Sequence, residues 1–421
     1  MATQTCRTGC RYWPRMKGPF FFAGGFAHWE AKLWDRGEVR DELSHIADIG
    51  FDFVRIMLPW NALQPTASHL RTPLLNRLAA LLDTIEEVGL TLQLTIVGQL
   101  AGTLFVPYWL LASQPEMARH GLSQRVIAED WISPWPLGDL YEENSLLAGQ
   151  RLLWHELTRH FATHPALTEL DLSAGGLLSL LTPRNPEIAV NWWQMLAEQT
   201  GDDSLSLLYS DSPALLMQPT ARFPYLHEWH DTVGQLAMAT TVRDSGTKKA
   251  ADEKWPLFQM QLAYTLAHAP VGCISLALPT APANRSHRLE EEQDPANPHP
   301  PLFYTEEQQA YFFHRTLPAL YDIGVPFICH STWADVPPTG YSMPPYDENT
   351  PLRHAGLLRE DGREKEVTSI WRTFHFHAEK ASKATPASIR RLDIDQDEWY
   401  QRRHEPDFVT TLYKQYQHGE I

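Results

Sequence analysis

The sequence predicts an α/β protein, a (β/α)8 TIM barrel with a short C-terminal extension. Two observations predict this fold class. Strand-like apolar runs alternate with helix-period segments from end to end, which is typical of a parallel sheet, and the strand-like runs number eight, as a closed barrel requires. We expect the barrel to occupy residues 1–380 and the extension, packed on the barrel, to occupy residues 381–421.

The first helix carries the clearest local signals. Asp35 can cap it, Glu38 stands three residues on, and Gly50 can end it. Apolar residues at helical spacing form one face, namely Val39, Leu43 and Ile46. The apolar run that follows Gly50 is then expected to be a strand.

The other elements follow the same alternation. We expect strands at 7–13, 51–58, 90–97, 166–173, 204–210, about 232–239, 271–278 and 325–331. We expect the later helices at about 73–89, 146–163, 186–199, 255–267, 311–324 and 366–380. Thr305 and Gln308 form a capping box before the helix at 311–324, in which Pro318 should cause a kink. The extension should hold a short strand at 390–394 and a helix near 406–417.

Two long segments interrupt the alternation of strands and helices. Residues 279–302 are rich in proline and acidic residues, and residues 336–351 carry several prolines. Both follow strands, so both should lie over the mouth of the barrel, the face formed by the C-terminal ends of its strands. Loops of this length are commonly lids or binding loops.

Composition excludes several classes of partner. The formal net charge is −16 and no basic stripe is present, so we expect no nucleic-acid partner. The apolar run at 19–26 is far too short to span a bilayer, so we expect no membrane partner. The N-terminus lacks the apolar core of a signal peptide, and the cysteines are too few for a disulfide framework (Cys6, Cys10, Cys273 and Cys329), so we expect a cytoplasmic protein with reduced cysteines.

The spacing of the histidines does not predict a metal site. His155 and His160 in WHELTRH are five residues apart, whereas a zinc-protease helix needs four to place both on one face. The segment HEWH at 227–230 has no third ligand nearby. We therefore expect no metal and no cofactor.

Five stretches of sequence, taken in order and spacing, resemble a known family. They are GCRYWPR (9–15), GFDFVRIMLPWNALQP (50–65), the strand that follows GL (89–90) together with PYWLL (107–111), TEEQQAYFFHRTLPALYDIGVP (305–326) and HAGLLREDGREK (354–365). Together they resemble the clan A glycoside hydrolases, most closely the cellulase- and mannanase-type barrels of glycoside hydrolase family 5, over about residues 7–378. The resemblance implies a (β/α)8 barrel and retaining hydrolysis of a β-glycoside. It also implies an acid/base glutamate after an Asn at the end of strand four, and a nucleophile glutamate at the end of strand seven.

The catalytic positions of the family do not match this sequence. In LDLSAGG (170–176) the Asn position holds Ala174 and the acid/base position holds Gly175. In PVGCISLALPT (270–280) the nucleophile position holds Ser275. Retaining hydrolysis needs two carboxyl groups roughly 5–5.5 Å apart, which glycine and serine cannot supply.

Other site positions of the family have changed as well. The resemblance assigns Arg11 to an Asn of strand one, Gln99 to a His after strand three, and Ser331 to a Trp of strand eight. A His-x-Tyr pair of strand six falls on Leu236 and Met238. The resemblance therefore implies a catalytically inactive barrel, retained to bind an oligo- or polysaccharide or a protein partner.

Two alternatives remain open at this stage. One is an active β-glycosidase that uses relocated carboxylates, for which Asp211, Glu228 and Asp335 lie at or beyond strand ends. The other is a structural subunit that partners an active relative. Asp171 shares strand parity with Gly175 but should lie roughly 13 Å below the strand tip, at about 3.3 Å per residue, so we expect it to be a buried structural group.

The candidate binding residues are Arg11, Arg55, Trp60, Gln99, Trp333 and Asp335. Trp60 is either packing at the rim or a platform for a sugar ring. Further aromatic residues are expected near the mouth, namely Trp13, Trp29, Trp34, Tyr108 and Trp109.

Overall fold

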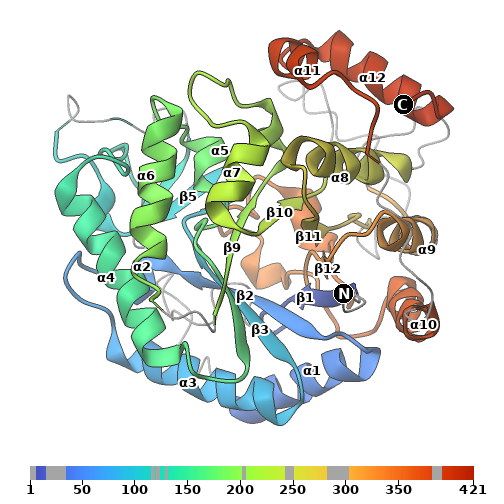
Figure 1. Cartoon of the computed structure of the whole chain (residues 1–421). Coiled ribbons are helices and arrows are strands. Elements are labelled where there is room, and N and C mark those ends of the chain that lie inside the picture. The colour runs from blue at the N-terminus through green and yellow to red at the C-terminus, as the bar shows by residue number, and fades with distance from the viewer. Residues whose placement is uncertain are drawn as a thin grey trace.

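Eight parallel strands close into a barrel (Figure 1). This computed structural model describes residues 6–15, 35–114, 119, 124–128, 131–201, 205–241, 251–281, 303–381 and 391–421. The strands of the barrel are β1 (Arg7–Arg11), β2 (Phe53–Pro59), β3 (Thr91–Val97), β8 (Leu167–Asp171), β9 (Ser206–Asp211), β10 (Leu236–Ala239), β11 (Val271–Leu276) and β12 (Phe327–His330). Their order around the barrel follows the chain, and β1 pairs with both β2 and β12 to close it. The predicted fold class is confirmed.

A ring of helices surrounds the strands in Figure 1. Its members are α1 (Arg36–Ile49), α3 (Thr72–Glu87), α4 (Asn144–Phe161), α6 (Pro186–Ala197), α7 (Leu226–Val233), α8 (Lys254–Ala267), α9 (Glu306–Asp322) and α10 (Glu366–Ala381). Two helices of four residues, α2 (Trp60–Leu63) and α5 (Leu177–Leu180), follow β2 and β8 directly.

The predicted caps are present. The Asp35 side chain accepts hydrogen bonds from the backbone N–H groups of Gly37 and Glu38, and Gly50 ends α1 in the left-handed conformation with φ 107°. Thr305 and Gln308 form the expected capping box, which starts α9 at Glu306, and this helix continues through Pro318. Local sequence therefore determines where these two helices begin.

Aromatic side chains fill the lower part of the barrel interior. Phe53 and Phe327 meet edge to face, with ring centroids 5.8 Å apart. Gly9 and Gly272 lie beside these rings, and a Cβ atom on either glycine would stand 2.3 or 2.2 Å from the nearest ring carbon. These two positions must be glycine for the rings to fit inside the barrel.

Two local predictions were wrong, and one small sheet was not predicted. The strand expected at 232–239 begins only at Leu236, because α7 continues to Val233 and Gly234 ends it. Residues 391–394 form no strand, since the backbone N–H of Leu392 donates to the Thr265 hydroxyl of α8 instead of to a neighbouring strand. The loop after β3 holds a four-stranded sheet that was not predicted, made of β4 (Gln99–Leu100), β5 (Thr103–Val106), β6 (Val126–Ala128) and β7 (Trp131–Ile132).

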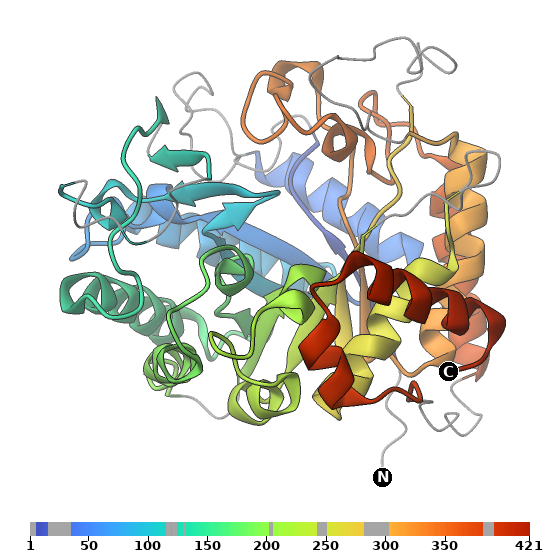
Figure 2. The same ribbon diagram turned by 90° about the horizontal axis from the view of Figure 1, so that it is seen from above.

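The C-terminal residues form two helices on the outside of the barrel, α11 (Gln396–Arg402) and α12 (Pro406–His418). Figure 2 shows both against α8. The Tyr413 hydroxyl of α12 donates to the Asp252 carboxylate at 2.6 Å, and this contact joins the extension to the start of α8. The helix near 406–417 was predicted, whereas α11 was not. Of the long segment 279–302, residues 282–302 lie outside the described residues.

Candidate functional site

A column of charged and polar side chains runs up the inside of the barrel. Arg7 pairs with Glu169, and Gln93 donates to the same carboxylate at 2.6 Å. The Arg55 guanidinium donates to Gln93 at 2.5 Å and to Asp171 at 2.5 Å. Both carboxylates are buried, so each needs the ion pair that it has.

Asp171 is fully engaged in this column. Besides Arg55, the hydroxyl of Ser210 and the backbone N–H of Ser173 donate to its carboxylate, the latter at 2.9 Å. Its side chain is 0% exposed. Asp171 therefore has the structural role that its depth in the strand predicts.

The tip of the fourth barrel strand is a tight turn. Ala174, Gly175 and Gly176 have φ angles of 51°, 83° and 86°, so three consecutive residues adopt the left-handed conformation. The backbone N–H groups of Gly98 and Gln99 both donate to the Ala174 carbonyl oxygen, at 2.9 and 3.2 Å. The turn is thus bound to the end of β3.

This turn leaves no room for a side chain at position 175. A Cβ atom on Gly175 would lie 2.6 Å from the carbonyl oxygen of Gln99, and the Gln99 side-chain amide donates to the Gly175 carbonyl oxygen. A Cβ atom on Gly176 would lie 2.6 Å from the Asp211 carboxylate. Gln99, predicted as a binding residue, is therefore engaged in holding this turn.

Position 275 lies at an irregularity of β11. The register between β11 and β12 shifts between Cys273 and Leu276. The Ser275 carbonyl oxygen accepts hydrogen bonds from the backbone N–H and the hydroxyl of Thr240, both at 3.0 Å. Its neighbour Ile274 packs in the interior cluster with Phe327 and Cys329. Apolar packing therefore lies next to the position at which the family resemblance implies a nucleophile.

The chain is similar to several solved structures. A variant of GH5_18 from Streptomyces cattleya, in complex with Manb1-4GlcNAc, shares 20% identity over 91% of this chain and 83% of that chain, with a TM-score of 0.66. GH5_18 from Bifidobacterium longum subsp. longum shares 18% identity over 95% of this chain and 90% of that chain, with a TM-score of 0.68. The exo-beta-1,4-mannosidase Op5Man5 from an Opitutaceae bacterium shares 18% identity over 90% of this chain and 60% of that chain, with a TM-score of 0.65. No protein-family model and no curated protein matches the sequence.

The chain has the fold of the family 5 glycoside hydrolases. At 18–20% identity the fold is what these proteins share, and the chemistry of this chain depends on its own residues at the mouth.

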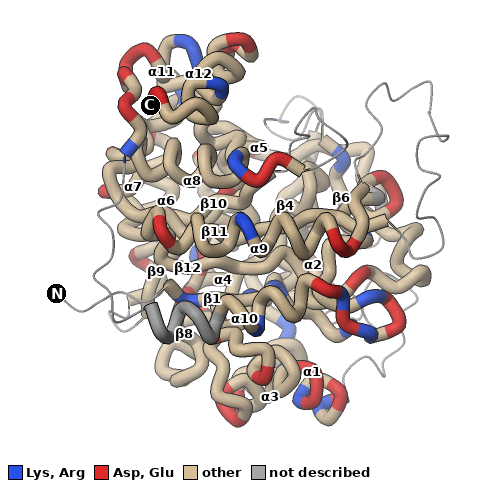
Figure 3. The backbone as a smooth tube through the Cα atoms, turned by 90° about the vertical axis from the view of Figure 1, so that its right-hand side faces the viewer, with Lys and Arg blue, Asp and Glu red and all other residues tan. Residues whose placement is uncertain are grey.

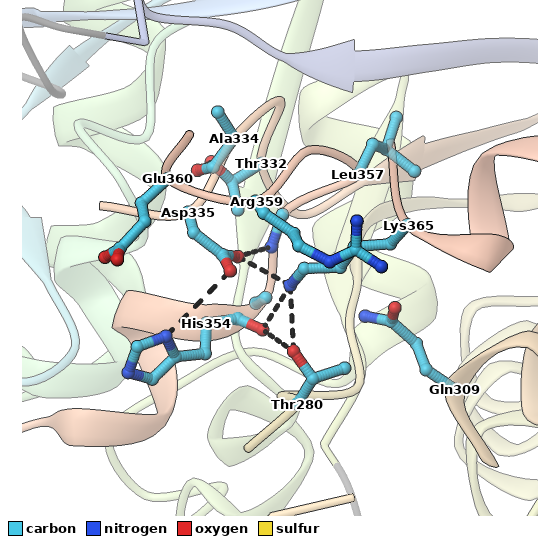
Figure 4. Close-up of polar contacts among 12 residues, drawn as sticks. Thr280, Gln309, Thr332, Ala334, Asp335, His354, Leu357, Arg359, Glu360 and Lys365 are labelled. Atoms are coloured by element: carbon cyan, nitrogen blue, oxygen red, sulfur yellow. Dashed lines mark hydrogen bonds and ion pairs between the residues drawn. The ribbon is translucent and has the colours of Figure 1, made fainter. Parts of the chain in front are cut away.

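Asp335, predicted as a binding residue, lies in a buried network above β12 (Figure 4). Its carboxylate accepts hydrogen bonds from the Lys365 ammonium at 2.7 Å and from the backbone N–H of Gly356 at 2.8 Å. The Lys365 ammonium also donates to the Thr280 hydroxyl at 2.9 Å and to the His354 carbonyl oxygen at 3.1 Å. The three N–H groups of the Lys365 ammonium are thus all used, by Asp335, Thr280 and His354, and none is left to donate to a ligand.

The network joins separate segments of the family 5 fold. Thr280 follows β11, Asp335 and His354 follow β12, and Lys365 precedes α10. Burial lowers the pKa of Lys365, and the Asp335 carboxylate opposes this shift. Asp335 therefore fixes the loops above the barrel, which argues against a role as a relocated catalytic group.

The other two relocated candidates face away from the barrel interior. Glu228 is exposed, and its carboxylate accepts a hydrogen bond from the backbone N–H of Tyr225 at the start of α7. Asp211 accepts a hydrogen bond at 2.5 Å from the hydroxyl of Tyr209, whose ring packs against Trp193 and Trp229 of the helix layer. Burial raises the pKa of Asp211 to about 7. Asp211 is thus a buried carboxyl group between strand and helix.

The predicted aromatic platform is packed inside the protein. Trp60 is 3% exposed, donates to the Gln64 side chain at 2.9 Å and meets Trp109 edge to face. Trp333 is 0% exposed and meets His45 edge to face. Neither ring offers a face to a sugar. The structure thus supports the packing alternative for Trp60 and argues against a binding role for Trp333.

The remaining aromatic candidates are scattered. Trp13 is buried, whereas Tyr108 is 60% exposed on the loop after β5. Trp29 and Trp34 lie outside the described residues. The structure thus brings together no aromatic cluster from the described part of this set.

Arg11 and Arg55 are neighbours across β1 and β2. Arg55 is 1% exposed and pairs with Asp171, whereas Arg11 is partly exposed. The predicted binding residues include three charged side chains, and two of them, Arg55 and Asp335, are held in ion pairs. Arg11 lies at the mouth and makes no ion pair with the described residues.

Sequence reasoning missed the lower members of the polar column, Arg7, Gln93 and Glu169. The available signal was a charged or amide side chain within a strand-like run, at the start of the first run for Arg7 and in the middle of later runs for Gln93 and Glu169. The described residues contain no group of three side chains suited to hold a metal ion, and no helix among them is long and apolar enough to cross a membrane. On the face shown in Figure 3, basic and acidic residues alternate and form no continuous basic stripe.

Proposed function

We propose that this chain is a carbohydrate-binding barrel with the glycoside hydrolase fold that does not hydrolyse glycosides. The observation that carries the proposal is the contact between Gly175 and Gln99. A glutamate cannot occupy position 175 in this backbone, because its Cβ atom would stand 2.6 Å from the Gln99 carbonyl oxygen. The family resemblance implies the acid/base group at this position.

The remaining carboxylates support the same proposal. Glu169 and Asp171, on the inner face of β8, are ion-paired with Arg7 and Arg55. A general acid or nucleophile needs a carboxyl group free to reach the substrate. The similar proteins point to saccharide as the ligand, since one of them is in complex with Manb1-4GlcNAc.

We also propose a cellular compartment and an alternative ligand. The cysteines Cys6, Cys10, Cys273 and Cys329 are free, which suits a reducing compartment, and we place the protein in the cytoplasm. A protein partner is the alternative ligand.

The test combines a hydrolysis screen with a binding screen on the full chain. We expect no turnover of aryl β-mannosides, aryl β-glucosides or Manβ1-4GlcNAc, and we expect binding to at least one saccharide by calorimetry. Turnover that survives repurification and disappears in Asp211→Asn or Asp335→Asn, in a variant whose melting curve shows that it is folded, would establish an active glycosidase with relocated carboxylates. A chain that neither hydrolyses nor binds any saccharide would support the structural-subunit alternative.

A further inference from the structure

The charges inside the barrel do not balance. Three arginines project from β1 and β2 into the barrel interior, and two carboxylates lie beside them. Arg7 pairs with Glu169 and Arg55 pairs with Asp171. Arg11 is left over. In the described part of the chain its side chain makes no ion pair, and its buried Nε has no hydrogen-bond partner.

The other groups around Arg11 supply no negative charge. Burial raises the pKa of Cys10 well above its ordinary value and that of Cys329 to about 11. Burial also raises the pKa of Tyr346. All three groups are therefore neutral near pH 7. Burial and the neighbouring Arg55 lower the pKa of Arg11, yet an arginine in a protein keeps its charge.

The place of Arg11 makes it reachable. It is the last residue of β1, so it lies at the C-terminal ends of the strands, where barrel enzymes bind their ligands. The residue is partly exposed although its Nε is buried, whereas Arg55 is 1% exposed. The protein around it is strongly acidic, with a net charge of −16, so an isolated cation at this position needs an explanation.

We propose that Arg11 receives the anionic group of an acidic saccharide, a carboxylate or a phosphate, at the barrel mouth. This inference rests on the proposed carbohydrate-binding function and names the class of saccharide. The planar guanidinium fork matches both oxyanions with two parallel hydrogen bonds. A poorly solvated charge without a partner is costly, and a bound anion removes that cost.

Calorimetry on the full chain tests the proposal with five probes: D-glucuronate, glucose 6-phosphate, glucose, mannobiose and inorganic phosphate. We expect glucuronate or glucose 6-phosphate to bind more tightly than glucose, and the stronger of the two identifies the anionic group. A charge-assisted hydrogen bond is worth enough to change affinity about tenfold or more, so Arg11→Gln should weaken that binding by at least this factor. Arg151→Gln, which removes an exposed charge from α4, is the matched control and should leave the affinity unchanged.

Thermal melting without ligand gives a second measurement. Arg11→Gln should be at least as stable as the parent, because it removes an unpaired charge next to Arg55. A clear loss of melting temperature in Arg11→Gln, with acidic sugars bound as before, would show a structural arginine and overturn the inference.

Other results of the calorimetry would distinguish a failure of the acidic-saccharide site from a failure of carbohydrate binding as a whole. If mannobiose or glucose binds and acidic sugars bind no better, with Arg11→Gln unchanged, the inference is overturned and the carbohydrate-binding function stands. If inorganic phosphate binds as tightly as both acidic sugars, Arg11 is a simple anion site and the saccharide assignment is overturned. If none of the saccharides binds, both the function and the inference are overturned.

Discussion

The carbonyl oxygen of Gln99 occupies the space in which a side chain on Gly175 would begin. A Cβ atom there would stand 2.6 Å from this oxygen. The backbone N–H of Gln99 donates to the carbonyl oxygen of Ala174. The segment after β3 and the turn at 174–176 are therefore hydrogen-bonded as well as in contact. The end of β3 and the tip of β8 have thus closed onto each other at the position where the family resemblance implies the acid/base glutamate.

The first prediction is that Gly175→Ala destabilises the fold by more than its backbone conformation explains. An L-residue in the left-handed region costs roughly 1–2 kcal/mol, and the contact with the Gln99 oxygen adds to that cost. Gly89→Ala is the matched control, because Gly89 has φ +77° and nothing within 4 Å of a Cβ atom. Urea denaturation of both variants measures the difference. Equal losses would mean that the turn at position 175 opens without cost.

The second prediction concerns restoration of the missing carboxylates. Ser275→Glu introduces a longer, charged side chain at a partly exposed position next to Ile274 of the interior cluster, and each of its polar atoms that is buried without a hydrogen bond costs about 1–3 kcal/mol. We expect Ser275→Glu to lower the melting temperature, and we expect Gly175→Glu with Ser275→Glu to show no strong hydrolysis, because the supporting side chains are missing. Melting curves and a fluorogenic β-glycoside assay measure both effects. A double variant that is active and as stable as the parent would mean that only two residues separate this chain from an enzyme.

The third prediction concerns the network above β12. Lys365→Met leaves the Asp335 carboxylate buried without its cation, which costs about 3–5 kcal/mol. Arg402→Met removes the exposed ion pairs of Arg402 with Glu398 and Glu405 and should cost only about 0–1 kcal/mol. Chemical denaturation of the two variants gives the comparison. Similar small losses in both would show that the Asp335 network contributes little to holding the loops.

The strands of the barrel were predictable because each is a run of apolar residues long enough to show a pattern. The sheet β4–β7 was not, since its strands have two to four residues and carry no period. Helix α7 was missed because it has only eight residues, too few to show a helical period, and begins at Leu226 without a side-chain cap of the usual Ser, Thr, Asp or Asn type.

The site was predictable only in part, for a related reason. The resemblance locates positions 175 and 275, but strand register decides which side chains meet. The pairing of Arg55 with Asp171 joins residues 116 positions apart, and the burial of Trp60 depends on Gln64 and Trp109. Neither relationship can be read from local sequence.

The last prediction is a pH dependence that originates at Asp211. Burial raises the pKa of this carboxyl group from 3.8 to about 7, so the folded state binds a proton that the unfolded chain releases. Its contribution to stability is complete below about pH 4 and is lost as the pH rises toward 7. One pKa unit corresponds to about 1.4 kcal/mol, so the loss is about 4 kcal/mol at most. Asp211→Asn stays neutral and keeps an oxygen for the Tyr209 hydroxyl and the Ser212 N–H. The melting temperature of Asp211→Asn relative to the parent should therefore rise between pH 4 and pH 8, whereas Asp41→Asn, an exposed change on α1, should show no such trend. Melting curves at four pH values across this range measure it, and parallel curves for Asp211→Asn and the parent would show that Asp211 does not retain its proton in the folded state.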